Sequence, residues 1–148
     1  MKSDFFAEPL PPAGLSRLIG ELERWPGSTA TSPSVGVQLN SWGGAIARVP
    51  SSATAFVHRD AHFLAIYGTT WSRRDGAARV AANHAWLEGF YARMRRFASG
   101  FAYQNLIDPQ LANWSHAYYG ANLARLIAVK RDYDPDDFFR FAQGIPAR

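Results

Sequence analysis

Hydrophobic positions along the 148-residue chain change their spacing several times. Leucine and isoleucine residues between positions 15 and 22 recur at helical spacing, which predicts an amphipathic helix over residues 13–25. Apolar and polar residues then alternate over 35–39, as they do in a half-buried strand. A second apolar stripe predicts a long helix over 75–98. The chain is therefore expected to combine strands and helices.

Other stretches have an extended pattern and are separated by short turns. We expect further strands at residues 2–6, 45–49, 54–59, 62–71 and 100–106. A closing helix is predicted over 111–131, and a short helical turn from Pro135 to near Gly144. This order predicts an α+β fold, with an antiparallel β-sheet, helices packed on one face, and a C-terminal helix and short helical turn.

The formal charge of +4 comes from arginine, because Lys2 and Lys130 are the only lysines. The dense run Arg93, Arg95 and Arg96 lies at the end of a predicted helix, where the helix dipole favours cations. No nucleic-acid partner is therefore expected. No stretch has the roughly 20 apolar residues of a membrane span, and the first residues lack a signal-peptide core, so the expected compartment is the cytoplasm, without a membrane partner.

The sequence has no cysteine, which excludes disulfides, thiolate catalysis and Cys-based zinc sites. His58 and His62 have the spacing of a helical zinc site, but their surroundings are strand-like. Residues four apart on a strand lie about 13 Å apart, so we expect structural histidines and no metal. Gly43 and Gly44 would admit a ligand to the main chain or form a bend in the sheet. The phosphate-binding patterns GxGxxG and GxxxxGK[ST] and the hydrolase pattern GxSxG are absent.

The closing segment contains an aromatic-rich pattern close to W-x3-YYG-x-N-x2-RL-x2-VK-x2-YDP-x2-F, followed by Ile-Pro. Its members are Trp114, Tyr118, Tyr119, Gly120, Asn122, Arg125, Leu126, Val129, Lys130, Tyr133, Asp134, Pro135, Phe138 or Phe139, Ile145 and Pro146. This pattern resembles the C-terminal element of the berberine-bridge-enzyme-like FAD-linked oxidases. The stretches "KSDFFAEPL", "WGGAIARVPSSATAFVHRD" and "AYQN" are similar to the preceding part of that family's substrate domain.

The resemblance implies that residues 1–112 form the C-terminal part of a substrate-binding domain. Residues 113–148 then form the berberine-bridge-type element, packed with it as one globular unit. The family oxidises alcohols, sugars or activated C–H bonds by hydride transfer to flavin. By resemblance the chain is the C-terminal portion of an FAD-dependent oxidoreductase, lining part of the pocket for a small-molecule substrate and covering the flavin ring.

The family's flavin domain lies N-terminal to the segment that this sequence resembles. The resemblance therefore implies that FAD is the cofactor but is not held by this chain alone. A flavin-binding domain, in a longer parent chain or a separate subunit, would also bind it. A sheet that begins with residues 2–6 also leaves a strand edge through which a homodimer could form. The alternative is a stand-alone, non-catalytic binding or interaction domain that keeps the fold.

The resemblance also assigns site residues. Tyr103 and Asn105 match the family's Tyr-x-Asn beside the flavin ring and, with Asn122, are the predicted cofactor contacts; a strand Tyr with a turn-capping Asn is the competing interpretation. Several family members carry a catalytic Tyr directly after that Asn, where this chain has Leu106.

Other family members place a Glu or Gln on the strand after the His-Arg pair. That position falls at Tyr67, with a one-residue ambiguity against Ile66, and makes Tyr67 the candidate catalytic base. The predicted substrate pocket is formed by Trp42, Gly43, Gly44 and His58.

Overall fold

A computed structural model describes residues 1–147, in which three antiparallel strands form one sheet with the order β1–β3–β2. The elements in chain order are β1 (Lys2–Phe6), α1 (Pro12–Leu22), β2 (Gly36–Ser41), β3 (Phe63–Gly68), α2 (Ala77–Met94), a 3₁₀ turn (Arg95–Phe97), α3 (Trp114–Tyr119), a second 3₁₀ turn (Gly120–Asn122) and α4 (Leu123–Tyr133). The α+β class and the antiparallel sheet are confirmed. No helix of residues 1–147 is both long and apolar enough to cross a membrane.

The register of the sheet decides which side chains share a face. Asp4 lies opposite Ala65, and Phe5 opposite Leu64, in the β1–β3 pair. Because successive side chains of a strand point to opposite faces, Phe5 and Phe6 project to different sides of the sheet. The two faces consequently have different chemistry.

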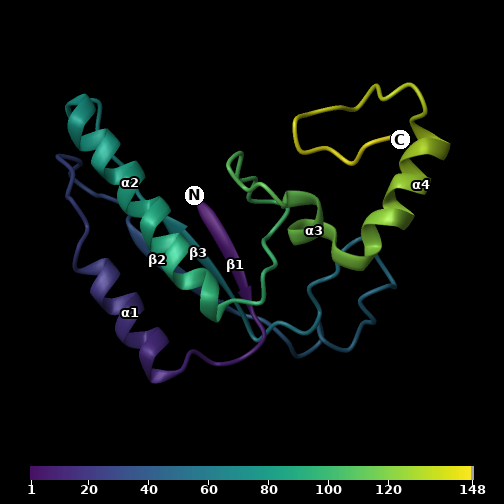
Figure 1. The fold of residues 1–148 in the computed structure, drawn as a ribbon, viewed down its shortest axis with the longest axis horizontal. Coiled ribbons are helices and arrows are strands. Elements are labelled where there is room, and N and C mark those ends of the chain that lie inside the picture. Colours follow the sequence, from purple (N-terminus) through teal and green to yellow (C-terminus); the bar gives the residue numbers. More distant parts are fainter. Residues whose placement is uncertain (148) are drawn as a thin grey trace.

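Helices α1 and α2 lie together against one face of the sheet (Figure 1). The core between them unites strand residues with apolar residues of both helices. Its buried members are Phe6, Leu18, Ala65, Tyr67, Trp86, Leu87, Phe90, Tyr91 and Met94. Removal of these apolar side chains from water is the main source of stability for the packing of the two helices on the sheet.

Buried charges in the same layer are paired, as isolated charges in an interior would be costly. Lys2 contacts Asp108 at 2.8 Å and Glu88 at 3.0 Å. Asp4 accepts a hydrogen bond from Arg95 at 2.8 Å. The sheet is thereby tied to the segment that follows α2.

Helices α3 and α4 lie beyond the end of the sheet, away from α1 and α2 (Figure 1). The buried Tyr118 hydroxyl accepts from the Asp108 amide at 2.9 Å and lies 3.2 Å from Gln143 Oε1. Gln143 in turn donates to the Asp108 carbonyl at 2.7 Å. These contacts attach the C-terminal segment to the rest of the chain.

The predicted strands at 45–49, 54–59 and 100–106 are wrong. The first two stretches form turns and irregular chain after Gly43 and Gly44, which both have positive φ. The third runs beside β1 with only two backbone bonds, Ser99 N to Phe5 O at 2.9 Å and Phe5 N to Phe101 O at 3.0 Å. It thus occupies part of the β1 edge without forming a strand.

The predicted closing helix is interrupted, and the helical turn after Pro135 is absent from the described residues. Gly120 adopts φ 48°, which ends α3 and redirects the chain into α4. A Cβ at Gly120 would lie 3.1 Å from Phe101 and 3.3 Å from Val57. Both the backbone angle and this close approach therefore require glycine here.

Candidate functional site

The sheet face opposite α1 and α2 carries a group of aromatic side chains, called here the aromatic face. It consists of Phe5, Trp42, Phe56, Phe101 and Tyr103, packed with Ala61, Leu64 and Ile66. The Tyr103 ring lies 6.1 Å from those of Phe5 and Trp42 and 6.5 Å from that of Phe56, all edge to face. Edge-to-face pairs stabilise a folded protein by more than the apolar area that they bury. These contacts therefore hold the rings of the aromatic face in fixed positions.

Tyr103 and Asn105, the predicted flavin contacts, lie together at the rim of this face. Asn105 Nδ2 donates to the Tyr103 hydroxyl at 3.0 Å. The Tyr103 amide donates to Ser3 Oγ at 2.9 Å, which fixes this segment to β1. Tyr103 is half-buried and Asn105 exposed, so both can be reached from outside.

Trp42 follows β2, and its amide donates to the His62 carbonyl at 2.8 Å. Gly43 and Gly44 come next, with φ of 110° and 55°. Their positive φ angles form the turn, and the Ile46 amide closes it on the Gly43 carbonyl at 3.0 Å. A Cβ at either glycine would meet nothing within 4 Å, so the main chain beside Trp42 is also open to a ligand.

His58, the fourth predicted pocket residue, is buried among aromatic rings. It stacks on Phe5 at 4.2 Å and meets Phe56 and Phe101 edge to face at 5.1 and 5.3 Å. Burial lowers the pKa of His58 from 6.5 to about 4. The imidazole is therefore neutral at pH 7, and it supports the aromatic face from behind Phe5.

Tyr67, the candidate base, points away from the aromatic face into the core under α2. Its side chain is fully buried and lies 5.2 Å from Phe90 and 5.8 Å from Tyr91, ring to ring. Burial, followed by the nearby Asp4 charge, raises the pKa of Tyr67 well above its ordinary value. The catalytic role of Tyr67 stays a prediction, and these surroundings count against it. Ile66 projects to the aromatic face but has no proton-accepting group.

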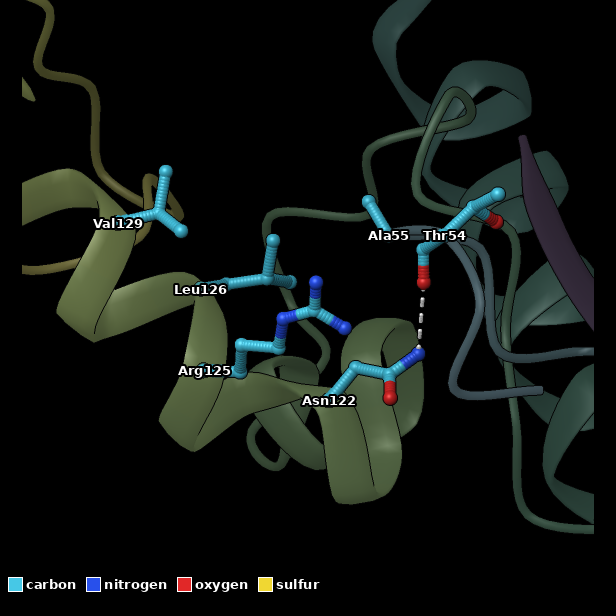
Figure 2. Close-up of a pocket in the computed structure, with 6 residues that line it drawn as sticks. All are labelled: Thr54, Ala55, Asn122, Arg125, Leu126 and Val129. Atoms are coloured by element: carbon cyan, nitrogen blue, oxygen red, sulfur yellow. Dashed lines mark hydrogen bonds between the residues drawn. The ribbon is translucent and has the colours of Figure 1, made fainter.

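Asn122, the third predicted cofactor contact, lies apart from Tyr103 and Asn105. Its amide donates to the Ser51 and Thr54 carbonyls at 2.7 and 3.1 Å, and Arg125 donates to the Ser52 carbonyl at 3.1 Å. A hollow of about 180 Å³ lies between α4 and the loop that contains Thr54; it is lined by Thr54, Ala55, Asn122, Arg125, Leu126 and Val129 (Figure 2). In the described chain Asn122 holds the loop that leads to Phe56.

Sequence reasoning missed Phe5, Phe56 and Phe101 as members of this surface. The alternation of β1 carried a signal for Phe5, since it faces the side opposite to the core residue Phe6. No pattern pointed to Phe56 and Phe101, because irregular segments place them there.

A family model described as "Berberine and berberine like" matches residues 102–146. The FAD-linked oxidoreductase YgaK of Bacillus subtilis is 37% identical over 142 residues, which cover 96% of this chain and 30% of that protein. The monolignol oxidoreductase AtBBE-like 13 of Arabidopsis thaliana is 31% identical, with 98% of this chain and 28% of that protein covered. The chain thus matches a portion of the berberine bridge enzyme-like FAD-linked oxidoreductases.

The fold agrees with solved members of the berberine bridge enzyme-like family. Berberine bridge enzyme from Eschscholzia californica superposes with a TM-score of 0.85 at 26% identity, covering 98% of this chain and 32% of that one. The glycopeptide hexose oxidase DBV29, solved with teicoplanin, superposes with a TM-score of 0.83 at 25% identity. The match covers 98% of this chain and 31% of that one. This chain spans about 30% of the length of the curated relatives that it matches.

FAD is the cofactor of these FAD-linked relatives, and the aromatic face can be tested for its fit to the flavin ring. Trp42 Nε1 and Asn40 Nδ2 are buried donors without a hydrogen-bond partner among residues 1–147. Asn40 lies opposite Leu64 and therefore on the same side of the sheet. A flavin ring combines a flat apolar body with an acceptor-rich edge. Aromatic rings with unpaired N–H donors fit both parts of it.

Proposed function

We propose that this chain forms part of the substrate pocket, and the face covering the flavin ring, of an FAD-dependent oxidoreductase. The observation that carries the proposal is the aromatic face, which places Trp42 and Tyr103 in contact and Asn105 beside them. It lies on the side of the sheet that α1 and α2 leave uncovered. Bound FAD would supply the hydride acceptor, and the chain would orient the reactants.

The predicted residues that lie on this face would have separate roles. The Tyr103–Asn105 pair would contact the flavin ring through its hydroxyl and amide groups. Trp42 and the open main chain at Gly43 and Gly44 would form a wall of the substrate pocket and exclude water from it. Ile66 occupies the β3 position that faces this surface and cannot take a proton, so Tyr67, on the core side of the same strand, stays the predicted base.

Relatives suggest the class of substrate. Names of similar proteins include a monolignol oxidoreductase, a glycopeptide hexose oxidase and a glucose oxidase variant. Monolignols, hexoses and glucose all carry alcohol groups. An alcohol, a sugar or a similar small molecule is accordingly the substrate that we propose for this face.

The flavin-binding portion would come from a longer parent chain or a separate subunit, and the C-terminal segment offers a surface for it. Tyr133, Phe138, Phe139 and Phe141 are 86%, 80%, 76% and 61% exposed. Exposed aromatic clusters of this kind mark interaction sites in soluble proteins. The presence of FAD-linked relatives more than three times as long supports a flavin-binding domain as the partner.

The test uses riboflavin, which carries the flavin ring without its phosphates. We expect saturable quenching of riboflavin fluorescence by the purified chain. Trp42→Ala should weaken this binding about fivefold or more, because it removes an aromatic wall worth roughly 1 kcal/mol. Trp71→Ala is the matched control, since Trp71 is exposed and its ring lies 4.6 Å from that of His84, outside the aromatic face.

A second measurement incubates the chain with FAD, removes free cofactor and records the visible spectrum. We expect most of the FAD to be lost, because the described residues include no loop that cradles a diphosphate. Equal loss of riboflavin binding in both tryptophan variants, or no saturable quenching in the wild-type chain, would count against the proposed face.

A further inference from the structure

A groove of about 330 Å³ lies along α1, on the helix-covered side of the molecule. It is lined by Ala13, Ser16, Arg17, Gly20, Arg24 and Arg96. Ala13, Ser16, Arg17 and Gly20 lie on one side of α1, Arg24 follows two residues after the end of this helix, and Arg96 comes from the 3₁₀ turn after α2. The groove is therefore separate from the aromatic face.

Positive charge exceeds negative charge around this groove. Glu21 is the fully buried carboxylate beside it, and Arg93 engages both its oxygens, at 2.7 and 2.6 Å. Arg24 and Arg17 also approach Glu21, at 3.1 and 3.5 Å. Three guanidinium groups thus share one carboxylate, and Arg93 makes the two shortest contacts with it.

Arg96 adds a fourth guanidinium with no ion pair anywhere in residues 1–147. It lies over the Phe97 ring at 4.6 Å. Stacking of this kind holds the planar group while leaving its edge N–H donors available. Arg96 is consequently held against a ring, and its guanidinium N–H donors have no partner among residues 1–147.

Small residues leave room between the arginines. Ala13, Ser16 and Gly20 lie along the groove, and a Cβ at Gly20 would be 3.8 Å from Arg24 Nη1. From Ala13 to Gly20 the helix advances about 10 Å, at 1.5 Å per residue, and Arg24 lines the groove beyond the end of α1. The groove is accordingly longer than a single phosphate group, which spans about 3 Å.

We propose that this groove binds an elongated anion carrying several phosphate-type groups. Arginine matches such groups because its planar fork pairs with two oxygens at once. Successive groups of the anion would contact Arg96, Arg17 and Arg24 along α1. The Ser16 hydroxyl would add a neutral hydrogen bond.

The test is isothermal titration calorimetry of the purified chain with tripolyphosphate and with orthophosphate at equal ionic strength. We expect tripolyphosphate to bind at least about tenfold more tightly, because it reaches more than one guanidinium. Raising the salt concentration should weaken binding, as the contacts are partly exposed to solvent. Equal affinity for the two anions would overturn the elongated site.

The variant Arg17→Gln/Arg96→Gln should lose tripolyphosphate affinity about tenfold or more. Arg131→Gln/Arg140→Gln is the control, because it removes the same charge from exposed positions on the C-terminal part of the chain. The control should change the affinity less than about twofold. Similar losses in both double variants would show general charge attraction and overturn the site, as would the absence of binding by the wild-type chain. Circular dichroism checks that each variant is folded.

Discussion

Arg95, directly after α2, donates from Nη1 to the carboxylate of Asp4 in β1 at 2.8 Å. Asp4 is fully buried, and its second oxygen has no hydrogen-bond partner in residues 1–147. Burial raises the pKa of Asp4 from 3.8 to about 7, although Arg95 partly opposes this rise. A central ion pair of this fold therefore titrates near neutral pH.

Asp4 should make the stability of the chain fall as the pH rises from about 4 to about 7. In that window the folded chain holds a proton on Asp4 that the unfolded chain has released, so deprotonation favours unfolding. The slope is at most about 1.4 kcal/mol per pH unit. Asp4→Asn should remove this contribution, as measured by urea unfolding at several pH values. Asp60→Asn, at an exposed position, should leave the slope unchanged, and an unchanged slope in Asp4→Asn would contradict the assignment.

His58 should act in the opposite direction at lower pH. Its pKa falls from 6.5 to about 4 on burial, so between these values the unfolded chain binds a proton that the folded chain excludes. The free energy of unfolding should thus decrease as the pH falls through this window. His58→Phe, which keeps a flat ring against Phe5, should reduce this acid sensitivity. His62→Gln serves as the exposed control, and an equal effect of the two variants would argue against a buried neutral His58.

The sequence predicted correctly the strands that pack one face against the core. The extended patterns at residues 2–6, 35–39 and 62–71 located β1, β2 and β3, because each strand contributes side chains to the core on the α1–α2 side. The extended pattern over 45–59 was misleading, since turns after Gly43 and Gly44 and around Pro50 interrupt the extended chain. The end of α3 depends on what fills the space beside Gly120, namely Phe101 and Val57 from distant segments. Such long-range contacts leave no periodic signal.

The candidate site was predicted in a similar way. Motif resemblance identified Trp42, Tyr103 and Asn105, and the structure brings these three together. Asn122 and Tyr67 came from the same resemblance but lie elsewhere. Strand pairing directs Tyr67 into the core and Ile66 toward the aromatic face. Counting residues along a motif leaves a one-residue ambiguity, which is enough to exchange the two faces.

Two helical glycines should respond differently to alanine. Each change improves helix propensity by about 1 kcal/mol. At Gly20 the new Cβ makes an ordinary contact, so Gly20→Ala should stabilise the chain. At Gly89 it would lie 2.8 Å from Arg93 Nη2 and displace that group from buried Glu21, costing charge-assisted hydrogen bonds worth roughly 1.5–3 kcal/mol. Urea midpoints should rise for Gly20→Ala and fall for Gly89→Ala; a rise for both would show that Arg93 relocates freely.

Lys130 should hold the exposed phenylalanines in place. Its ammonium contacts Asp134, Asp137 at 2.9 Å and the Phe139 carbonyl at 2.6 Å. Asp134 accepts in turn from the Phe138 and Phe139 amides, at 2.8 and 3.1 Å. Lys130→Met should accelerate hydrogen exchange at these two amides by about tenfold, because Asp134 loses the cation that orients it. Arg131→Met, next along α4, should not, and equal exchange in the two variants would mean that the loop is held by other contacts.

The order β1–β3–β2 has a consequence for synthesis on the ribosome. Of the three strands, Lys2–Phe6 is translated first; it pairs with Phe63–Gly68, and its outer edge meets Phe101. Phe5 and Phe6 are therefore synthesised well before the strand that they pair with. During that interval β1 displays two phenylalanines and unpaired amides, the kind of segment that chaperones bind, and the sheet closes only once β3 has been translated.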